Sequence, residues 1–154
     1  MFNESVLKEI ESVKEKYPDQ KSALLPVLYI AQREFGWLSH DALTAVAASL
    51  NLPEATVRGT ASFYSMFRHK EMGRNLVQLC TNISCMILGS EKLVDFLETK
   101  FKVRPGETTE DSRFSLVIME CIGACGTAPA MLVNTDYYDN LTEEKITEIL
   151  ETYE

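Results

Sequence analysis

Two short runs, Cys80-Thr-Asn-Ile-Ser-Cys85 and Cys121-Ile-Gly-Ala-Cys125-Gly-Thr-Ala-Pro129, decide how the rest of the sequence is interpreted. They contain all four cysteines of the 154-residue chain, spaced as C-x4-C and C-x3-C, with 35 residues between the two pairs. Each run follows an apolar segment with the composition of a β-strand, residues 75–79 and residues 114–119. Two strands that each deliver two thiols to one rim of a sheet would build a metal site with four thiolate ligands.

The spacing of the cysteines favours a [2Fe-2S] cluster over other uses of four thiols. A C-x4-C element occurs in plant-type ferredoxins, whereas structural zinc usually takes tighter pairs such as C-x2-C. Small residues surround the second pair, so that backbone N–H groups can approach sulfur: Gly123, Ala124, Gly126 and Ala128. Two alternatives stay open: a zinc ion bound by four thiolates, or two disulfide bonds without a metal. A thioredoxin-type dithiol enzyme would need C-x2-C at the start of a helix, and the chain has none.

The composition limits the classes of function open to the chain. The formal net charge of −8 argues against nucleic acid as a partner. The charge is uneven, because residues 1–74 hold nine Lys or Arg and nine Asp or Glu, whereas residues 75–154 hold six and fourteen. There is no run of about 18 apolar residues, and the start lacks the features of a signal peptide. We expect a reducing cytosol and no membrane insertion, so the cysteines are metal-binding, catalytic or buried thiols rather than disulfides.

Residues 1–73 have the pattern of a small helical bundle. Apolar residues recur at helical spacing, and Ser22 and Ser39 are placed to cap the second and third helices. Pro53 suits the first position of a fourth helix that would end near Arg58. Short helices joined by short loops predict an N-terminal helical domain.

A dense apolar and aromatic patch follows these helices at Phe63, Tyr64, Met66 and Phe67. The sequence favours a core position for this patch, and the alternative is a surface that binds a partner, where aromatic residues and Met are enriched. The pair Met72-Gly73 then marks the predicted boundary between two domains.

Residues 74–154 predict the element order β-α-β-β-α. The elements are a strand over 75–79, a helix after Ser90, strands over 114–119 and 130–133, and a last helix capped by Thr142. The order predicts a parallel crossover between the first two strands and an antiparallel pairing for the third. It matches the second half of a thioredoxin-like fold, and the predicted class of the whole chain is α+β.

Taken together, these motifs resemble the thioredoxin-like [2Fe-2S] ferredoxin subunit of NADH dehydrogenase, the small iron–sulfur subunit in the peripheral arm of respiratory complex I. The two cysteine runs carry the resemblance, which covers the chain from about Tyr17 to Leu150. It extends to Gly36-Trp37, Ala61-Ser-Phe-Tyr-Ser-Met-Phe67, Pro105-Gly-Glu-Thr-Thr109 and Tyr137-Tyr-Asp-Asn-Leu-Thr142.

The resemblance implies one [2Fe-2S] cluster with four thiolate ligands, from Cys80, Cys85, Cys121 and Cys125. It also implies a helical domain that docks the partner and an electron-transfer role beside a flavoprotein subunit that binds FMN and NADH. This division agrees with the absence of a nucleotide-binding fingerprint and of any catalytic constellation in the sequence. We expect the chain to join other peripheral-arm subunits of an NADH:quinone oxidoreductase, in the cytoplasm and peripheral to the membrane.

Two other functions remain open. The same family includes subunits of NAD-linked hydrogenases, bifurcating ones among them, and of NAD-linked formate dehydrogenases. A module stabilised by zinc, with a structural or interaction role, is the alternative from a different class.

Overall fold

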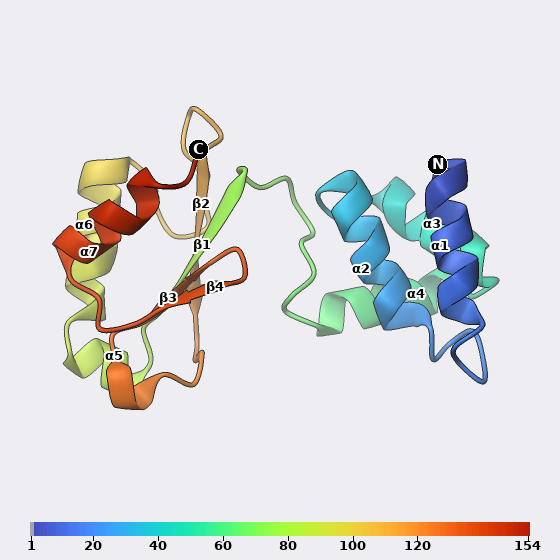
Figure 1. Cartoon of the computed structure of the whole chain (residues 1–154), viewed down its shortest axis with the longest axis horizontal. Coiled ribbons are helices and arrows are strands. Elements are labelled where there is room, and N and C mark those ends of the chain that lie inside the picture. Colours follow the sequence, from blue (N-terminus) through green and yellow to red (C-terminus); the bar gives the residue numbers. More distant parts are fainter. Residues whose placement is uncertain (1) are drawn as a thin grey trace. The chain divides into compact units, whose positions relative to one another are not determined.

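The computed structural model describes residues 2–154, which divide into two compact units between Glu71 and Met72 (Figure 1). The first unit contains four helices: α1 (Glu4–Lys14), α2 (Leu24–Phe35), α3 (His40–Leu50) and α4 (Glu54–Phe63). The second contains a sheet and its covering helices. The combination confirms the predicted α+β class. No helix in residues 2–154 is both long and apolar enough to cross a membrane.

The core of the first unit is formed by the apolar faces of its four helices. Side chains of Ile10, Leu28, Val46 and Leu50 are almost completely inaccessible to solvent. Burying an aliphatic side chain of this kind stabilises a fold by about 1.5–3 kcal/mol. The interlocking of these faces therefore holds together helices that are each too short to be stable alone.

Two details of the helix ends differ from the sequence prediction, although Ser39 caps α3 as expected. Ser22 is not a cap, because both its N–H and its hydroxyl donate to the carboxylate of Asp19, and α2 begins later. Helix α4 does not end near Arg58 but continues to Phe63. The burial of Val57 and Ala61 on one face of α4 outweighs the poor helix propensity of the intervening glycine.

The aromatic patch at the end of α4 is divided between the core and the surface. Phe67 is buried, with 4% of its surface exposed, whereas Phe63 is 79% exposed and Met66 is also exposed. The side-chain amide of Gln32 fixes this turn by donating to Met66 O at 3.1 Å and accepting from Arg68 N at 2.6 Å. The core prediction is therefore wrong for Phe63 and Met66 and right for Phe67, while Tyr64 is half-buried and packs against the core.

The second unit is built on a four-stranded sheet of order β2-β1-β3-β4. Its elements in chain order are β1 (Asn75–Cys80), α5 (Ile83–Ile87), α6 (Ser90–Phe101), β2 (Phe114–Met119), the 3₁₀ turn η1 (Cys125–Thr127), β3 (Met131–Val133), β4 (Asp136–Tyr138) and α7 (Glu143–Glu151). Strands β1 and β2 are parallel, and β3 pairs antiparallel with β1 and with β4. The predicted crossover and the antiparallel third strand are confirmed.

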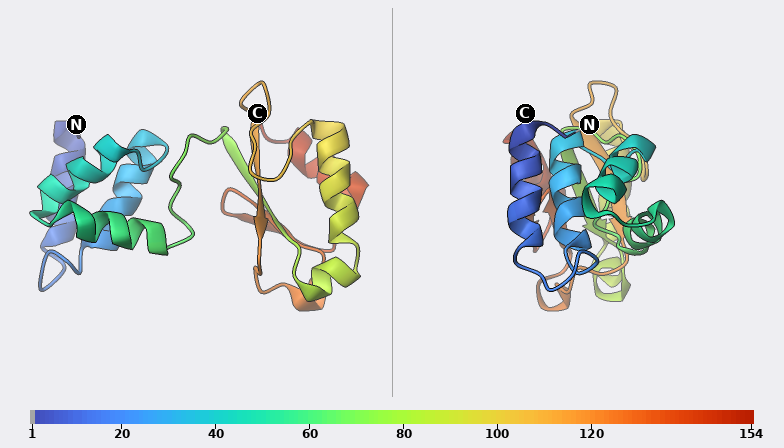
Figure 2. Two further views of the ribbon diagram at one scale, coloured as in Figure 1. Left: turned by 180° about the vertical axis from the view of Figure 1, so that it is seen from behind. Right: turned by 90° about the vertical axis from the view of Figure 1, so that its right-hand side faces the viewer.

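Helices α6 and α7 lie on the same face of this sheet (Figures 1 and 2). Alternate strand residues point at them, and the resulting core includes Val77, Leu79, Leu116, Leu97 and Ile146. Strands β1 and β2 are parallel, so their carboxyl ends lie at the same edge of the sheet.

The start of β1 is fixed against β2 by a close approach at Gly73. Its N–H donates to Ser115 Oγ at 2.7 Å, and a Cβ at this position would lie 2.9 Å from Ser112 O and 3.0 Å from the Phe114 carbonyl carbon. Such a backbone-to-backbone contact leaves no room for a side chain. This contact therefore fixes the beginning of β1, the strand whose last residue is Cys80.

Candidate iron–sulfur site

All four cysteines line one hollow of about 350 Å³ in the second unit, and each carries a free thiol. Cys80 is the last residue of β1, and Cys121 comes two residues after the end of β2. Because these strands are parallel, their carboxyl ends meet at one edge of the sheet and bring the two thiols there. Cys85 comes from α5, and Cys125 opens η1.

Helix α5 is the part of the site that the sequence prediction did not contain. The sequence predicts a loop between the first two cysteines, but five residues from Ile83 onward are helical. The side chain of Asn82 accepts from Ile83 N at 2.7 Å at the start of this helix. One helical turn is too short to show an apolar period, and the N-cap residue was its one sequence signal.

The two pairs of thiols lie in different surroundings. Cys80 and Cys85 are buried and form a small apolar cluster with Ala128 and the half-buried Ile122. Cys121 and Cys125 are exposed. A group bound in the hollow would therefore have a dry side, made by the first pair, and a side that faces solvent.

Backbone N–H groups point at several of the sulfur atoms. Burial acts to raise the pKa of the Cys80 thiol, but the N–H groups of Asn82 and Ile122 and the neighbouring thiols outweigh it, and the pKa is lowered. Gly123 donates its N–H to Cys121 Sγ at 3.3 Å. These donors stabilise negative charge on sulfur, as ligands of a metal require.

At Cys85 the surroundings favour the protonated thiol. Burial is the main reason that the pKa of its thiol is raised, and the hydrogen bond and charge of Cys80 add to it, while the Ala130 N–H opposes them. A cation in the hollow would reverse this balance, because a coordinating thiol loses its proton. The predicted donor Gly126 makes no hydrogen bond to a cysteine within residues 2–154.

The donor set fits an iron–sulfur cluster. Cysteine thiolates are the ligands of [2Fe-2S] clusters, and the hollow offers four of them and no carboxylate or imidazole. The thiol of Cys80 lies within hydrogen-bonding reach of the thiols of Cys85 and Cys121, so the four side chains form one ligand set.

A thioredoxin-like sheet with four thiols at the carboxyl edge of its parallel strands defines a class of iron–sulfur proteins. The chain belongs to the thioredoxin-like [2Fe-2S] ferredoxin family, whose pattern matches residues 10–154. The cofactor of the chain is accordingly a [2Fe-2S] cluster.

Proteins with closely similar sequences carry names that agree with this family. The chain is 44% identical over 145 residues to an NADH-quinone oxidoreductase subunit of Rhizobium meliloti, covering 94% of this chain and 86% of that protein. It is 40% identical over 155 residues to an NADH-quinone oxidoreductase subunit of Rickettsia felis, covering 99% and 93%. Mitochondrial NADH dehydrogenase [ubiquinone] flavoprotein 2 of Dictyostelium discoideum is 39% identical over 97% of this chain and 62% of that protein.

A solved structure shares the fold. An NAD⁺-reducing [NiFe]-hydrogenase in the air-oxidised state superposes with a TM-score of 0.73 and 27% identity over 84% of this chain. The match covers 22% of that hydrogenase chain, so the similarity concerns one part of a longer polypeptide.

Proposed function

We propose that the chain is the electron-transfer subunit of an NADH:quinone oxidoreductase, with Cys80, Cys85, Cys121 and Cys125 as ligands of its [2Fe-2S] cluster. The observation that carries the proposal is that these four thiols line one hollow. The relatives from Rhizobium meliloti and Rickettsia felis, which match almost the whole chain, support the choice of complex. The chain has no catalytic site of its own and serves an oxidoreductase as one subunit.

The bound cluster supplies a group that accepts and returns one electron at a time. The residues of the chain set how readily it does so. The acidic surroundings, with six Lys or Arg against fourteen Asp or Glu in residues 75–154, oppose the extra negative charge of reduction and lower the potential. The N–H groups of Ile122 and Gly123 have the opposite effect, because they favour negative charge on sulfur.

The partner in this proposal is a flavoprotein subunit that binds FMN and NADH and passes electrons to the cluster one at a time. Residues 1–73 act as the helical domain that docks to the complex, and residues 74–154 hold the cluster. Assembly with other peripheral-arm subunits would place the chain in the cytoplasm, at the membrane surface through the complex and without insertion of its own.

A role in an NAD-linked hydrogenase is the second candidate, and the shared fold of the NAD⁺-reducing hydrogenase favours it. The relatives from Rhizobium meliloti, Rickettsia felis and Dictyostelium discoideum described above are named as NADH dehydrogenase subunits, which supports the first candidate. No observation gives comparable support to the other two alternatives, a subunit of an NAD-linked formate dehydrogenase and a module stabilised by zinc.

The test is reduction of the cluster through the flavoprotein. The full chain with its cluster is mixed with the FMN-containing subunit of an NADH:quinone oxidoreductase, and the cluster is followed by EPR after NADH is added. We expect a spin-half signal that requires both the flavoprotein and NADH. A cluster that dithionite reduces but that NADH leaves oxidised in the presence of the flavoprotein would contradict the proposal.

A further inference from the structure

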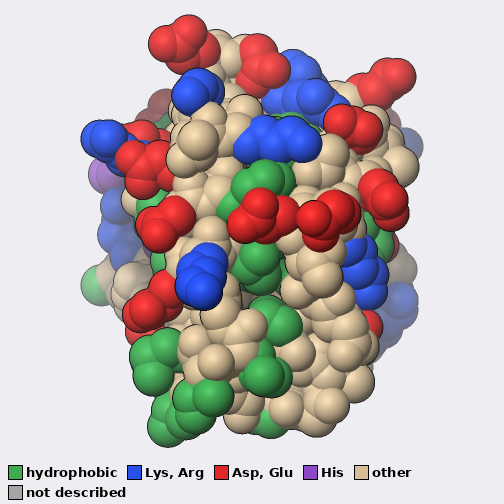
Figure 3. All heavy atoms as spheres, turned by 90° about the vertical axis from the view of Figure 1, so that its left-hand side faces the viewer, with side chains coloured by type: hydrophobic (Ala, Val, Ile, Leu, Met, Phe, Trp, Pro, Cys, Tyr) green, Lys and Arg blue, Asp and Glu red, His purple; other side chains and the backbone are tan. Residues whose placement is uncertain are grey.

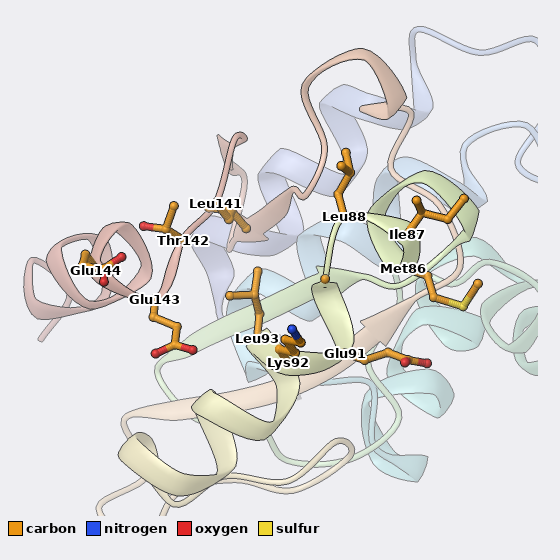
Figure 4. Close-up of a pocket in the computed structure, with 11 residues that line it drawn as sticks. Met86, Ile87, Leu88, Glu91, Lys92, Leu93, Leu141, Thr142, Glu143 and Glu144 are labelled. Atoms are coloured by element: carbon orange, nitrogen blue, oxygen red, sulfur yellow. The ribbon is translucent and has the colours of Figure 1, made fainter.

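The second unit has another hollow, of about 790 Å³, between the end of α5 and the start of α7. The buried side chains of Leu93 and Leu141 form its floor. Residues Met86 to Leu88 form one wall, and the first turn of α7 forms the other (Figure 4). We call this hollow the α5–α7 groove.

The wall formed by α5 and the residue after it exposes unusually many apolar side chains. Ile87 is 73% exposed, and Ile83, Met86 and Leu88 are exposed as well. Hydrophobic side chains gather in the lower part of the second unit in Figure 3, at the height of α5. A contiguous apolar surface of this kind, bordered by polar groups, marks an interaction site on a soluble protein.

The rim of the groove is acidic. Three carboxylates line it, from Glu91, Glu143 and Glu144, against one ammonium group, from Lys92. Within residues 2–154, the carboxylates of Glu91 and Glu143 have no hydrogen bond or ion pair, whereas that of Glu144 accepts from Thr142 at the start of α7. Two of the three negative charges are therefore available to a partner.

Charge excludes several occupants. An anionic lipid surface and a nucleic acid would both be repelled by the rim. A second copy of this chain would bring the same acidic rim and an overall charge of −8. A polypeptide segment that presents apolar side chains flanked by Lys or Arg complements both the floor and the rim.

The groove also lies beside the cysteine site, because both use the same short helix. Ile83 and Cys85 of α5 line the cysteine hollow, and Met86 and Ile87 of the same turn line the groove. A partner seated in the groove is thus adjacent to the thiols. Of the possible partners, the one that exchanges electrons with the cluster is the one that must bind next to the thiols.

We propose that the α5–α7 groove is the docking site for a basic, apolar segment of the flavoprotein subunit, an inference that rests on the function proposed above. The groove fixes where on the second unit the redox partner binds. It also gives a role to the apolar side chains that α5 exposes beside the cysteine hollow.

The test is a binding titration of the full chain, loaded with its cluster, against the purified FMN-containing flavoprotein subunit. The double variant Glu91→Lys with Glu143→Lys and the single variant Ile87→Asp should each weaken binding at least tenfold. The double variant should also lose most of the salt dependence that the unaltered chain shows. An unchanged EPR spectrum of each variant establishes that the cluster and the fold are intact.

Two matched controls separate the groove from general effects. The double variant Glu148→Lys with Glu151→Lys makes the same charge change at exposed positions of α7 outside the groove, and Tyr137→Asp makes the same kind of polar change at an exposed residue of β4 outside the groove. Both should bind the flavoprotein within twofold of the unaltered chain.

The possible outcomes distinguish the two proposals. If the unaltered chain binds but the groove variants bind equally well, the groove inference is wrong and the proposed function stands. If the unaltered chain does not bind the flavoprotein, both are wrong. Self-association of the chain that is lost in Ile87→Asp would overturn the inference by making a second copy the occupant.

Discussion

The close approach at Gly73 gives the most direct test of how the sheet positions the cysteines. In Gly73→Ala the new methyl group would lie 2.9 Å from Ser112 O, 3.0 Å from the Phe114 carbonyl carbon and 3.1 Å from Phe114 N. All three atoms belong to the backbone, so no side-chain rotation can relieve the overlap. Forcing one extra carbon into a packed region costs about 1–3 kcal/mol.

Hydrogen exchange measures this effect without assuming a single unfolding transition, which a two-unit protein with a bound cofactor does not satisfy. A loss of about 1–3 kcal/mol corresponds to exchange that is roughly 5- to 150-fold faster. We expect this acceleration at the β1 amides that bond to β2, which end at Cys80.

The control is a glycine with room around it. Gly59 lies inside α4, has no atom within 4 Å of an added Cβ and does not need a positive φ. Gly59→Ala should therefore stabilise α4 by about 0.5–1 kcal/mol, seen as slower exchange of its amides. If Gly73→Ala left β1 exchange within threefold of the unaltered chain, the contact would not fix the strand as described.

Three further predictions address the site, the surface and pH. Cys121→Ser should lose or strongly perturb the two-iron EPR and visible spectra, whereas Ser84→Ala, a change in the same hollow, should preserve them; a normal spectrum in Cys121→Ser would refute the ligand assignment. Phe63→Asp should weaken assembly with the flavoprotein while leaving the melting temperature within a few degrees. Phe67→Ala should instead destabilise the first unit by about 3–5 kcal/mol, measured by hydrogen exchange of its amides. Equal losses of stability in the two variants would show that Phe63 is a core residue. Burial, followed by hydrogen bonds to Asp136 and Tyr138, raises the pKa of Tyr153 above its usual value. The protonated phenol therefore contributes fully to stability below about pH 10, and this contribution is lost as the pH rises toward the pKa of the folded state. Thermal melts between pH 8 and 11 should show a fall in melting temperature that is smaller in Tyr153→Phe, and an identical fall in that variant would contradict the reasoning.

Long-range order in the second unit was predictable because it depends on strong local patterns. The apolar runs before each cysteine pair indicated two strands, and the intervening helix required them to be parallel. That geometry alone brings Cys80 and Cys121 to one edge. The prediction agrees best with the structure at β1, because this strand is buried on both faces and its continuous apolar run is typical of a central strand.

Predictions failed where a short-range contact or a small element decided the outcome. Asp19 takes the hydrogen bonds of Ser22, and no rule of spacing distinguishes a capping serine from one that is itself bound. Helix α5 is a single turn, so it has no period to detect. The turn after Phe63 is held by Gln32, and this contact joins distant parts of the sequence that no local pattern relates.

The central claim is that the four thiols hold a two-iron cluster, and metal analysis tests it most directly. Iron, acid-labile sulfide and zinc are measured per chain in protein purified without air, together with an EPR spectrum after reduction. The account predicts about two iron and two sulfide per chain, no zinc and a spin-half signal. One zinc per chain without sulfide would leave the fold intact and contradict the electron-transfer function.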